Sequence, residues 1–267
     1  MSFTGIPLVL DQWLDVGGGK ICNLTAAKVF SSQPIAGQGQ GDPMPPIDSL
    51  YGWYKADGYS YADGADVTLP VLDFSGQSNH LNASNSLPLN ELVFHTNIIN
   101  GLPVLRVEVS AEDTNRDIPD FGASGYTGAI VIRKRTHNAS LPTIDVMGAQ
   151  GFGVTLALRY VSTASQVSYT FRGLGASITT PIVVPLDSWQ IITFSMSAAE
   201  GIPRLKTNNT ETSGPVTAGA VTITAIAIQI SSVCDVAEAL NYSKKLSDSE
   251  LHDLRAYLSV KYGIAII

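Results

Sequence analysis

The fold is decided by the stretch that closes the chain: Val236-Ala-Glu-Ala-Leu-Asn-Tyr-Ser-Lys-Lys-Leu246-Ser247-Asp-Ser-Glu250. Its first half is a short apolar run of strand length. Its last four residues form a capping box, in which the Ser247 hydroxyl accepts from a backbone N–H and the Glu250 carboxylate reaches back. Apolar residues then recur at helical spacing up to Gly263, and glycine is typical of helix ends. We therefore expect a strand followed by a C-terminal amphipathic helix, whose apolar face comprises Leu251, Leu254, Tyr257, Leu258 and Tyr262.

Short apolar runs separated by turn signals extend back from this stretch to Leu50. Residues 221–228 alternate large and small side chains, which is typical of a strand with one buried face. Asn100-Gly101 is a tight-turn signal between two such runs. The pattern predicts an all-β sandwich, with strands at residues 51–56, 92–95, 104–109, 128–133, 153–160, 166–171, 182–186, 189–196, 221–230 and 236–242.

The first 50 residues have a different pattern, which predicts an N-terminal arm ahead of a sandwich at residues 51–267. A Gly- and Pro-rich run at residues 37–46 is typical of a linker. Before it lies an apolar stretch of the kind that soluble monomers generally keep from water. We therefore expect the arm to contact a neighbouring subunit, as swapped arms do, in a homo-oligomer or larger assembly. The expected contact residues are Ile6, Leu8, Leu10, Trp13 and Leu14.

The composition narrows the classes of function. Hydrophobic residues make up 45% of the chain, enough for a buried core, and charged residues only 15%. The net charge of −7 would repel a phosphate backbone, so nucleic acid is not an expected partner, and the basic run at residues 133–135 is expected at a solvated hairpin tip. We find no apolar stretch of membrane-helix length and no signal-peptide pattern. Cys22 and Cys234 are expected as buried thiols, with a bridge between them as the alternative.

Four motifs follow one another in order: Trp53-Tyr-Lys-Ala-Asp57 with Asp73-Phe-Ser-Gly-Gln-Ser-Asn79, then Asn100-Gly-Leu-Pro-Val-Leu-Arg106, then Asp187-Ser-Trp189, then the closing stretch. Together they resemble the concanavalin A-like lectin/glucanase (laminin G-like) domains over residues 51–264. The resemblance implies two antiparallel sheets in a jelly-roll sandwich. It implies little about function, because this fold hosts lectins, glycanases, adhesion modules and virion proteins.

Candidates for catalysis are few. A glycanase on this fold needs two carboxylates about 5–5.5 Å apart in one cleft. The nearest candidates, Glu108 and Glu112, are followed at Asp113 by an expected loop. Glu238 stands alone in an apolar strand, and we interpret it as a buried acceptor for backbone or hydroxyl groups. The four histidines lack ligand spacing, so no metal site is expected. The sequence thus predicts a protein that is not an enzyme.

A Gly-rich turn region brings aromatic and acidic residues together. Aromatic faces stack on the C–H surfaces of sugars and Asp side chains bond hydroxyls, so this region is a candidate glycan-binding patch. The same carboxylates could hold calcium, but they miss the EF-hand spacing and Asp-Gly pairs commonly form turns, so no cofactor is expected. The candidate residues are Tyr54, Tyr59, Tyr61, Asp57, Asp63 and Asp66.

Three functions stay open. We favour a structural or adhesive component of a larger assembly, a bacteriophage virion protein of the decoration or tail (receptor-binding) type. A sandwich with its own tethered arm suits a protein that is assembled rather than secreted. The alternatives are a carbohydrate-binding, lectin-like protein at the cell surface or outside the cell, and a glycoside hydrolase with an unrecognised site. The expected partners are other protein subunits and surface glycans, and the expected location is the virion.

Overall fold

The computed structural model describes residues 13–15, 20–22, 44–68, 70–83, 92–107, 111–117, 125–136, 143–151, 154–163, 165–173, 176–177, 182–197, 199–214, 225–231 and 234–266. Internal contacts divide the chain into two compact units, Met1–Asp42 and Pro43–Ile267. In the first unit, β1 (Trp13–Asp15) and β2 (Lys20–Cys22) pair as an antiparallel hairpin.

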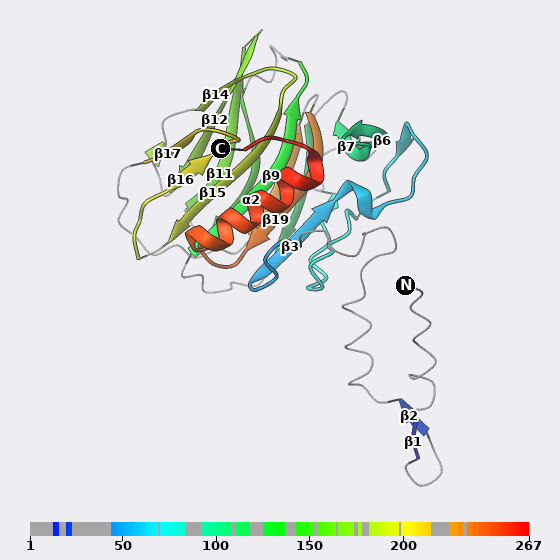
Figure 1. Cartoon of the computed structure of the whole chain (residues 1–267). Coiled ribbons are helices and arrows are strands. Elements are labelled where there is room, and N and C mark those ends of the chain that lie inside the picture. Colours follow the sequence, from blue (N-terminus) through cyan, green and yellow to red (C-terminus); the bar gives the residue numbers. More distant parts are fainter. Residues whose placement is uncertain are drawn as a thin grey trace. The chain divides into compact units, whose positions relative to one another are not determined.

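The second unit contains two antiparallel sheets. One sheet, which we call the helix-side sheet, has the order β17-β16-β15-β9-β19-β7-β6-β4, with β3 also pairing to β19. Figure 1 shows β3 alongside β19, with the C-terminal helix lying across this sheet. Its strands are β3 (Leu50–Lys55), β4 (Ala65–Asp66), β6 (Leu92–Ile99), β7 (Leu102–Val107), β9 (Gly125–Lys134), β15 (Trp189–Ser197), β16 (Arg204–Lys206), β17 (Glu211–Ser213) and β19 (Cys234–Tyr242).

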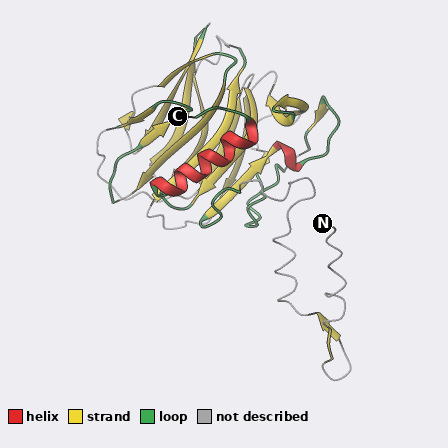
Figure 2. Cartoon of the chain, viewed as in Figure 1, coloured by secondary structure: helices red, strands yellow, loops and turns green. Residues whose placement is uncertain are grey.

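The other sheet, which we call the second sheet, has the order β13-β12-β11-β10-β18-β8-β5, with β14 also pairing to β12. Strands make up most of the described chain, as Figure 2 shows. The second sheet consists of β5 (Asn82–Ala83), β8 (Ala111–Asp117), β10 (Thr143–Gly151), β11 (Val154–Ser162), β12 (Gln166–Gly173), β13 (Ala176–Ser177), β14 (Ile182–Pro185) and β18 (Ala225–Ser231).

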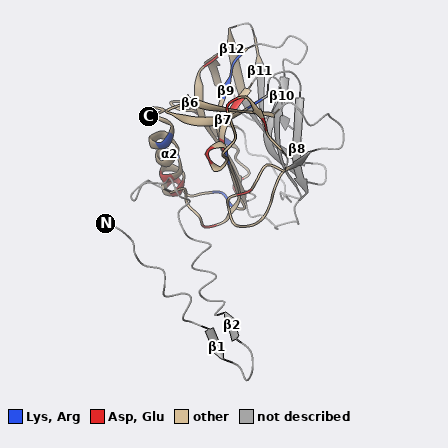
Figure 3. Ribbon diagram, turned by 90° about the vertical axis from the view of Figure 1, so that its right-hand side faces the viewer, with Lys and Arg blue, Asp and Glu red and all other residues tan. Residues whose placement is uncertain are grey.

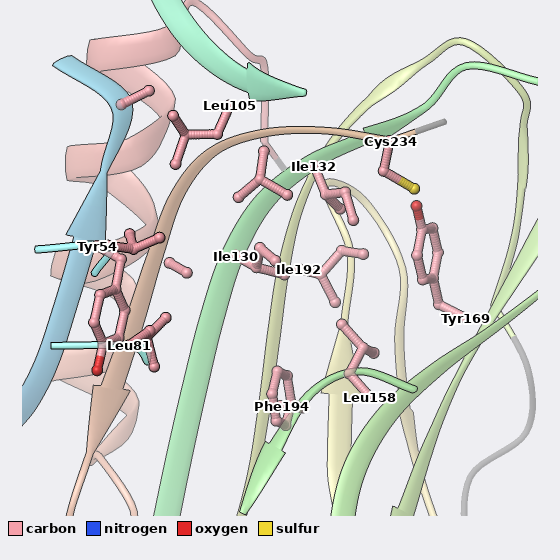
Figure 4. Close-up of a cluster of buried hydrophobic side chains, with 14 of the residues drawn as sticks. Tyr54, Leu81, Leu105, Ile130, Ile132, Leu158, Tyr169, Ile192, Phe194 and Cys234 are labelled. Atoms are coloured by element: carbon pink, nitrogen blue, oxygen red, sulfur yellow. The ribbon is translucent and has the colours of Figure 1, made fainter. Parts of the chain in front are cut away.

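The core lies in two layers. One apolar cluster joins side chains of the helix-side sheet, such as Ile130 and Phe194, to side chains of the second sheet, such as Leu158 and Tyr169 (Figure 4). A second cluster lies on the opposite face of the helix-side sheet and includes Val131, Leu240 and helix residues such as Leu254. Figure 3 shows the helix outside the sheet that contains β6, β7 and β9. The predicted two-sheet antiparallel sandwich with one C-terminal helix is confirmed.

The predicted helix is α2 (Asp248–Tyr262), and its ends are as expected. The Ser247 side chain accepts from Glu250 N, the Glu250 carboxylate accepts from Ser247 N, and Gly263 adopts the left-handed conformation with φ 64°. The hydrogen bond from Lys244, followed by the bonds from Ser247, holds the pKa of Glu250 at about 2. The acidic residue therefore stays charged beside the positive end of the helix.

Each predicted strand overlaps an observed one, and two long strands were missed. Residues 111–117, expected to run into a loop, form β8, which pairs along its whole length with β18. Its sequence, AEDTNRD, has no apolar alternation to predict a strand. β18 provides the hydrogen-bonding partners of β8, and the sequence of β8 itself gives no sign of this pairing. β10 was also missed.

A β-bulge in β19 determines the side of the helix-side sheet on which the Glu238 side chain lies. Its register against β9 shifts between Val236 and Glu238, so Ala237 is the extra residue. Val236 belongs to the cluster between the sheets, whereas Ala237 and Leu240 belong to the cluster under α2. A regular strand would point Glu238 the same way as Val236, and the bulge instead turns it towards the helix.

Candidate functional site

The tyrosine ledge, which we define as Tyr59 and Tyr61 with Phe74 behind them, is the candidate site. The two tyrosine rings are stacked, with centroids 5.6 Å apart and planes 22° apart. Phe74 packs edge-on against Tyr59 at 6.1 Å between centroids. Both tyrosines are half-buried and pack on the cluster between the sheets. The rings therefore have a fixed backing and a partly exposed surface.

Hydrogen bonds fix both rings of the ledge. The Tyr59 hydroxyl accepts from Leu72 N at 2.6 Å, and the Tyr61 hydroxyl lies 2.9 Å from Thr68 Oγ1. Burial, partly offset by the bond from Leu72, raises the pKa of Tyr59 to about 12, so the ring stays neutral at physiological pH. Leu72 itself is 40% exposed, which adds apolar surface beside the rings.

The turn that precedes the ledge depends on Gly58. It ends the short 3-10 helix η1 (Ala56–Gly58), which Tyr59 N closes by donating to Ala56 O. A Cβ on Gly58 would lie 2.1 Å from the Phe74 ring. Any side chain there would displace Phe74, and with it the backing of Tyr59.

The loop behind Phe74 is held by a buried carboxylate. Asp73 accepts from Trp53 N and Ser75 N through one oxygen, and from Ser75 Oγ and Asn79 N through the other. The Asn79 side chain donates to Tyr51 O. The motif at residues 73–79 thus positions Phe74, which packs against Tyr59. The sequence did not indicate that this motif contributes to the site.

The predicted acidic residues separate into two environments. Asp63 is exposed, accepts from Thr96 N at 2.9 Å and lies 3.4 Å from His95 Nδ1. The bond from Thr96 is the main cause that lowers the pKa of Asp63. Asp66 is exposed in β4. Asp57 instead pairs with Lys261 of α2 at 3.0 Å and faces the helix.

Tyr54 does not belong to the site, which corrects the sequence-based prediction. It is 4% exposed, and its hydroxyl donates to Asn79 O at 2.7 Å. Figure 4 shows it beside Leu81 in the buried cluster. Tyr54 follows the strand alternation of β3 into the sandwich, whereas Tyr59 and Tyr61 come after the strand has ended.

Glu238 is fully buried and accepts from four side chains. Trp53 Nε1 and Tyr257 OH donate to Oε1, at 2.5 and 2.8 Å, and Lys261 Nζ and Tyr262 OH donate to Oε2, each at 2.7 Å. Burial, and then the Glu238 charge, raise the pKa of Tyr257 and of Tyr262, which keeps both as donors. The interpretation of Glu238 as a buried acceptor agrees with this geometry, although the sequence named none of its partners.

The basic run at residues 133–135 is not a solvated tip. Arg133 and Arg106 both bind the fully buried Asp235, at 2.6 Å each, and Arg133 lies over the Trp189 ring. Lys134 is buried, and burial lowers its pKa. The prediction was wrong because it considered the charges without the acidic strand, β19, that pairs with β9.

Some predicted residues lie outside the described part of the chain. They include Ile6, Leu8, Leu10 and Glu108, and the side chains of Trp13, Leu14, Cys22 and Glu112. Cys234 is a buried thiol. Among the described residues, no group of three or more His, Cys, Asp and Glu is placed to hold a metal ion. None of the helices in the described ranges is long and apolar enough to cross a membrane.

The fold and the ledge define an antiparallel β-sandwich with a half-exposed aromatic surface. The chain matches no family model and no curated protein. Among solved structures it is similar to a Trypanosoma rangeli sialidase mutant that displays trans-sialidase activity, with TM-score 0.53 and 14% identity over 87% of this chain and 36% of that one. It is also similar to a chain of botulinum neurotoxin type C, whose cell entry depends on interaction with two ganglioside molecules. That likeness has TM-score 0.51 and 10% identity over 81% of this chain and 52% of that one.

These comparisons show the fold, and they correct one prediction. The chain spans about a third of the length of the sialidases and about half that of the toxin chain. The expectation that this protein is not an enzyme is contradicted, because the neighbours include sialidases, and we withdraw it. The structural neighbours include sialidases, one of them in complex with sialic acid, and a neurotoxin whose cell entry depends on interaction with two ganglioside molecules.

Proposed function

We propose that the sandwich binds carbohydrate at the tyrosine ledge. The observation that carries this proposal is the stacked, half-buried pair of Tyr59 and Tyr61. Such a pair offers a rigid aromatic face to the C–H surface of a sugar, and its rings lose little freedom on binding because hydrogen bonds already hold them. Asp63 and Asp66 follow within five residues of Tyr61 and can accept hydrogen bonds from sugar hydroxyls.

The comparisons support a carbohydrate ligand in general terms. One of the sialidase structures contains sialic acid, and the toxin interacts with gangliosides. The resemblance of residues 51–264 to concanavalin A-like lectins supports the same class of ligand. Attachment to a larger particle, with a bacteriophage virion as the favoured one, stays part of the proposal. Residues 1–42, which form their own unit, would supply the attachment.

The test is glycan-array binding of Tyr59→Ala, Tyr61→Ala and the double variant. Removing one stacking face should weaken binding on the order of tenfold, as loss of a central aromatic contact does at other interfaces. The control is Val183→Ala, because Val183 is 52% exposed on β14 of the second sheet.

The melting temperature of each variant separates loss of the site from loss of the fold. We expect the tyrosine variants to stay folded and the Val183→Ala protein to bind like the wild type. Unchanged binding in the folded double variant would place the carbohydrate site elsewhere.

A further inference from the structure

Negative charge predominates in the segment that forms the tyrosine ledge. The segment 51–83, which supplies the ledge, contains Asp57, Asp63, Asp66 and Asp73 but only one Lys or Arg, Lys55. Lys55 is 3% exposed and lies over the Trp53 ring, so its charge is turned away from solvent. Two exposed carboxylates, those of Asp63 and Asp66, therefore face solvent in this segment without an exposed Lys or Arg to offset them.

Asp63 and Asp66 follow Tyr61 by two and five residues, in a turn and a strand that pair with β6. Ala65 of β4 pairs with Phe94 of β6, and the Phe94 ring packs against Tyr61 with 5.8 Å between centroids. Gly64 N also donates to Phe94 O at 2.8 Å. Asp63 and Asp66 thus stand on either side of a turn that is fastened to the residue beneath Tyr61.

The cations that approach this segment from other elements are already paired. Lys261 of α2 binds both Asp57 and Glu238, and its side chain is 11% exposed. Arg106 of β7 binds Asp235. His95 of β6 lies against Asp63 itself. None of these described groups offers an unpaired positive charge to an anionic ligand at the ledge.

We infer that the ledge selects uncharged, hydroxyl-rich sugars and discriminates against sialylated ones. This inference rests on the proposed function: the aromatic pair makes the site, and the carboxylates set its selectivity. A sugar carboxylate brought to about 4 Å from one aspartate in water loses about fivefold in affinity. The protein would then differ in ligand from the neighbours that bind sialic acid and interact with gangliosides.

The experiment compares matched glycan pairs, each with and without its terminal sialic acid, for binding to the full-length protein. We expect the asialo member to bind at least about fivefold more tightly at low salt. The ratio of the affinity for the asialo glycan to the affinity for the sialylated one should fall as the ionic strength rises, because exposed charges are screened. Asp63→Asn combined with Asp66→Asn should bring the ratio towards one, since Asn can still accept the bond from Thr96 N.

The control variant is Asp187→Asn, which removes one negative charge from the turn between β14 and β15. Asp187 is exposed and has a φ of 58°, a conformation that Asn tolerates. It should leave the ratio unchanged. Equal or tighter binding of sialylated glycans, or an unchanged ratio in the Asp63/Asp66 variant, would overturn the inference and leave the proposed function standing. Binding of neither glycan class would instead refute the proposed function.

Discussion

At the residue scale, buried acidic side chains hold the helix-side sheet together. Glu238, Asp235 and Asp73 are each less than 10% exposed, and each accepts from several donors. A buried charge is tolerated only when its hydrogen-bonding capacity is filled, and removal of one partner leaves the others unpaired. The side chains that donate to Glu238 come from two elements, β3 and α2.

Replacement of Glu238 by Ala should cost about 3–5 kcal/mol of the free energy of unfolding, the usual effect of breaking a buried ion pair. Trp53 Nε1 and the hydroxyls of Tyr257 and Tyr262 would each lose the carboxylate as acceptor. Lys261 would keep Asp57 and the Tyr257 hydroxyl but lose its buried anionic partner. Urea unfolding measures the change. Glu238→Gln is the matched variant and should cost less, since the amide oxygen can still accept. A cost below about 0.5 kcal/mol for Glu238→Ala would show that the network does not form.

At the element scale, α2 connects the sheet to the ledge. Lys261, in the last turn of α2, binds both Glu238 of β19 and Asp57 of η1. The short helix η1 ends at Gly58, directly before Tyr59. The Asn100 side chain, in the turn between β6 and β7, donates to Lys261 O at 2.8 Å. Docking of the helix thus helps to place the ledge, although its residues are distant in sequence.

The stability of α2 should depend more on docking than on its cap. Ser247→Ala should cost about 1 kcal/mol, through loss of the hydroxyl that accepts from Glu250 N. Leu254→Ala should cost about 2–5 kcal/mol, because the Leu254 side chain is fully buried where α2 packs on the helix-side sheet. Thermal or urea unfolding of the two variants gives the comparison. Equal, negligible changes would mean that the helix is not packed on the sheet as described.

At the scale of the whole molecule, the sandwich is a unit separate from residues 1–42. Pro45 and Leu50 are buried within the second unit, so a truncation should end before them. Of the predicted arm, residues 1–50, only residues 1–42 belong to the first unit, and a truncation should remove these residues alone. Its role in assembly stays a prediction.

Deletion of residues 1–42 should leave a folded sandwich with an almost unchanged melting temperature, because the contacts of residues 43–267 form their own unit. If the arm mediates assembly, the truncated protein should sediment as a smaller species than the full-length one. Calorimetry and analytical ultracentrifugation measure the two outcomes. An unfolded truncation would assign the arm to the core, and unchanged sedimentation would exclude it as the assembly contact.

Local signals in the sequence determined the secondary structure of this protein to a large extent. The capping box at Ser247 and Glu250 is present, and so is the stop at Gly263. Asn100 and Gly101 have positive φ values of 48° and 76°, as the predicted tight turn requires. Such signals are readable because capping and turn formation involve residues within a few positions of one another.

The tertiary structure alone decided which way the polar side chains face. The bulge at Ala237 turned Glu238 towards α2, and the pairing of β9 with β19 brought Arg133 to Asp235. Tyr54 went into the core while Tyr59, just past the end of its strand, stayed at the surface. A one-residue shift in register exchanges the two faces of a strand, and register depends on partners far along the chain. Tyr59 and Tyr61 of the candidate site could therefore be named from sequence, but Phe74 behind them, the stacking of the two rings and their exposure could not.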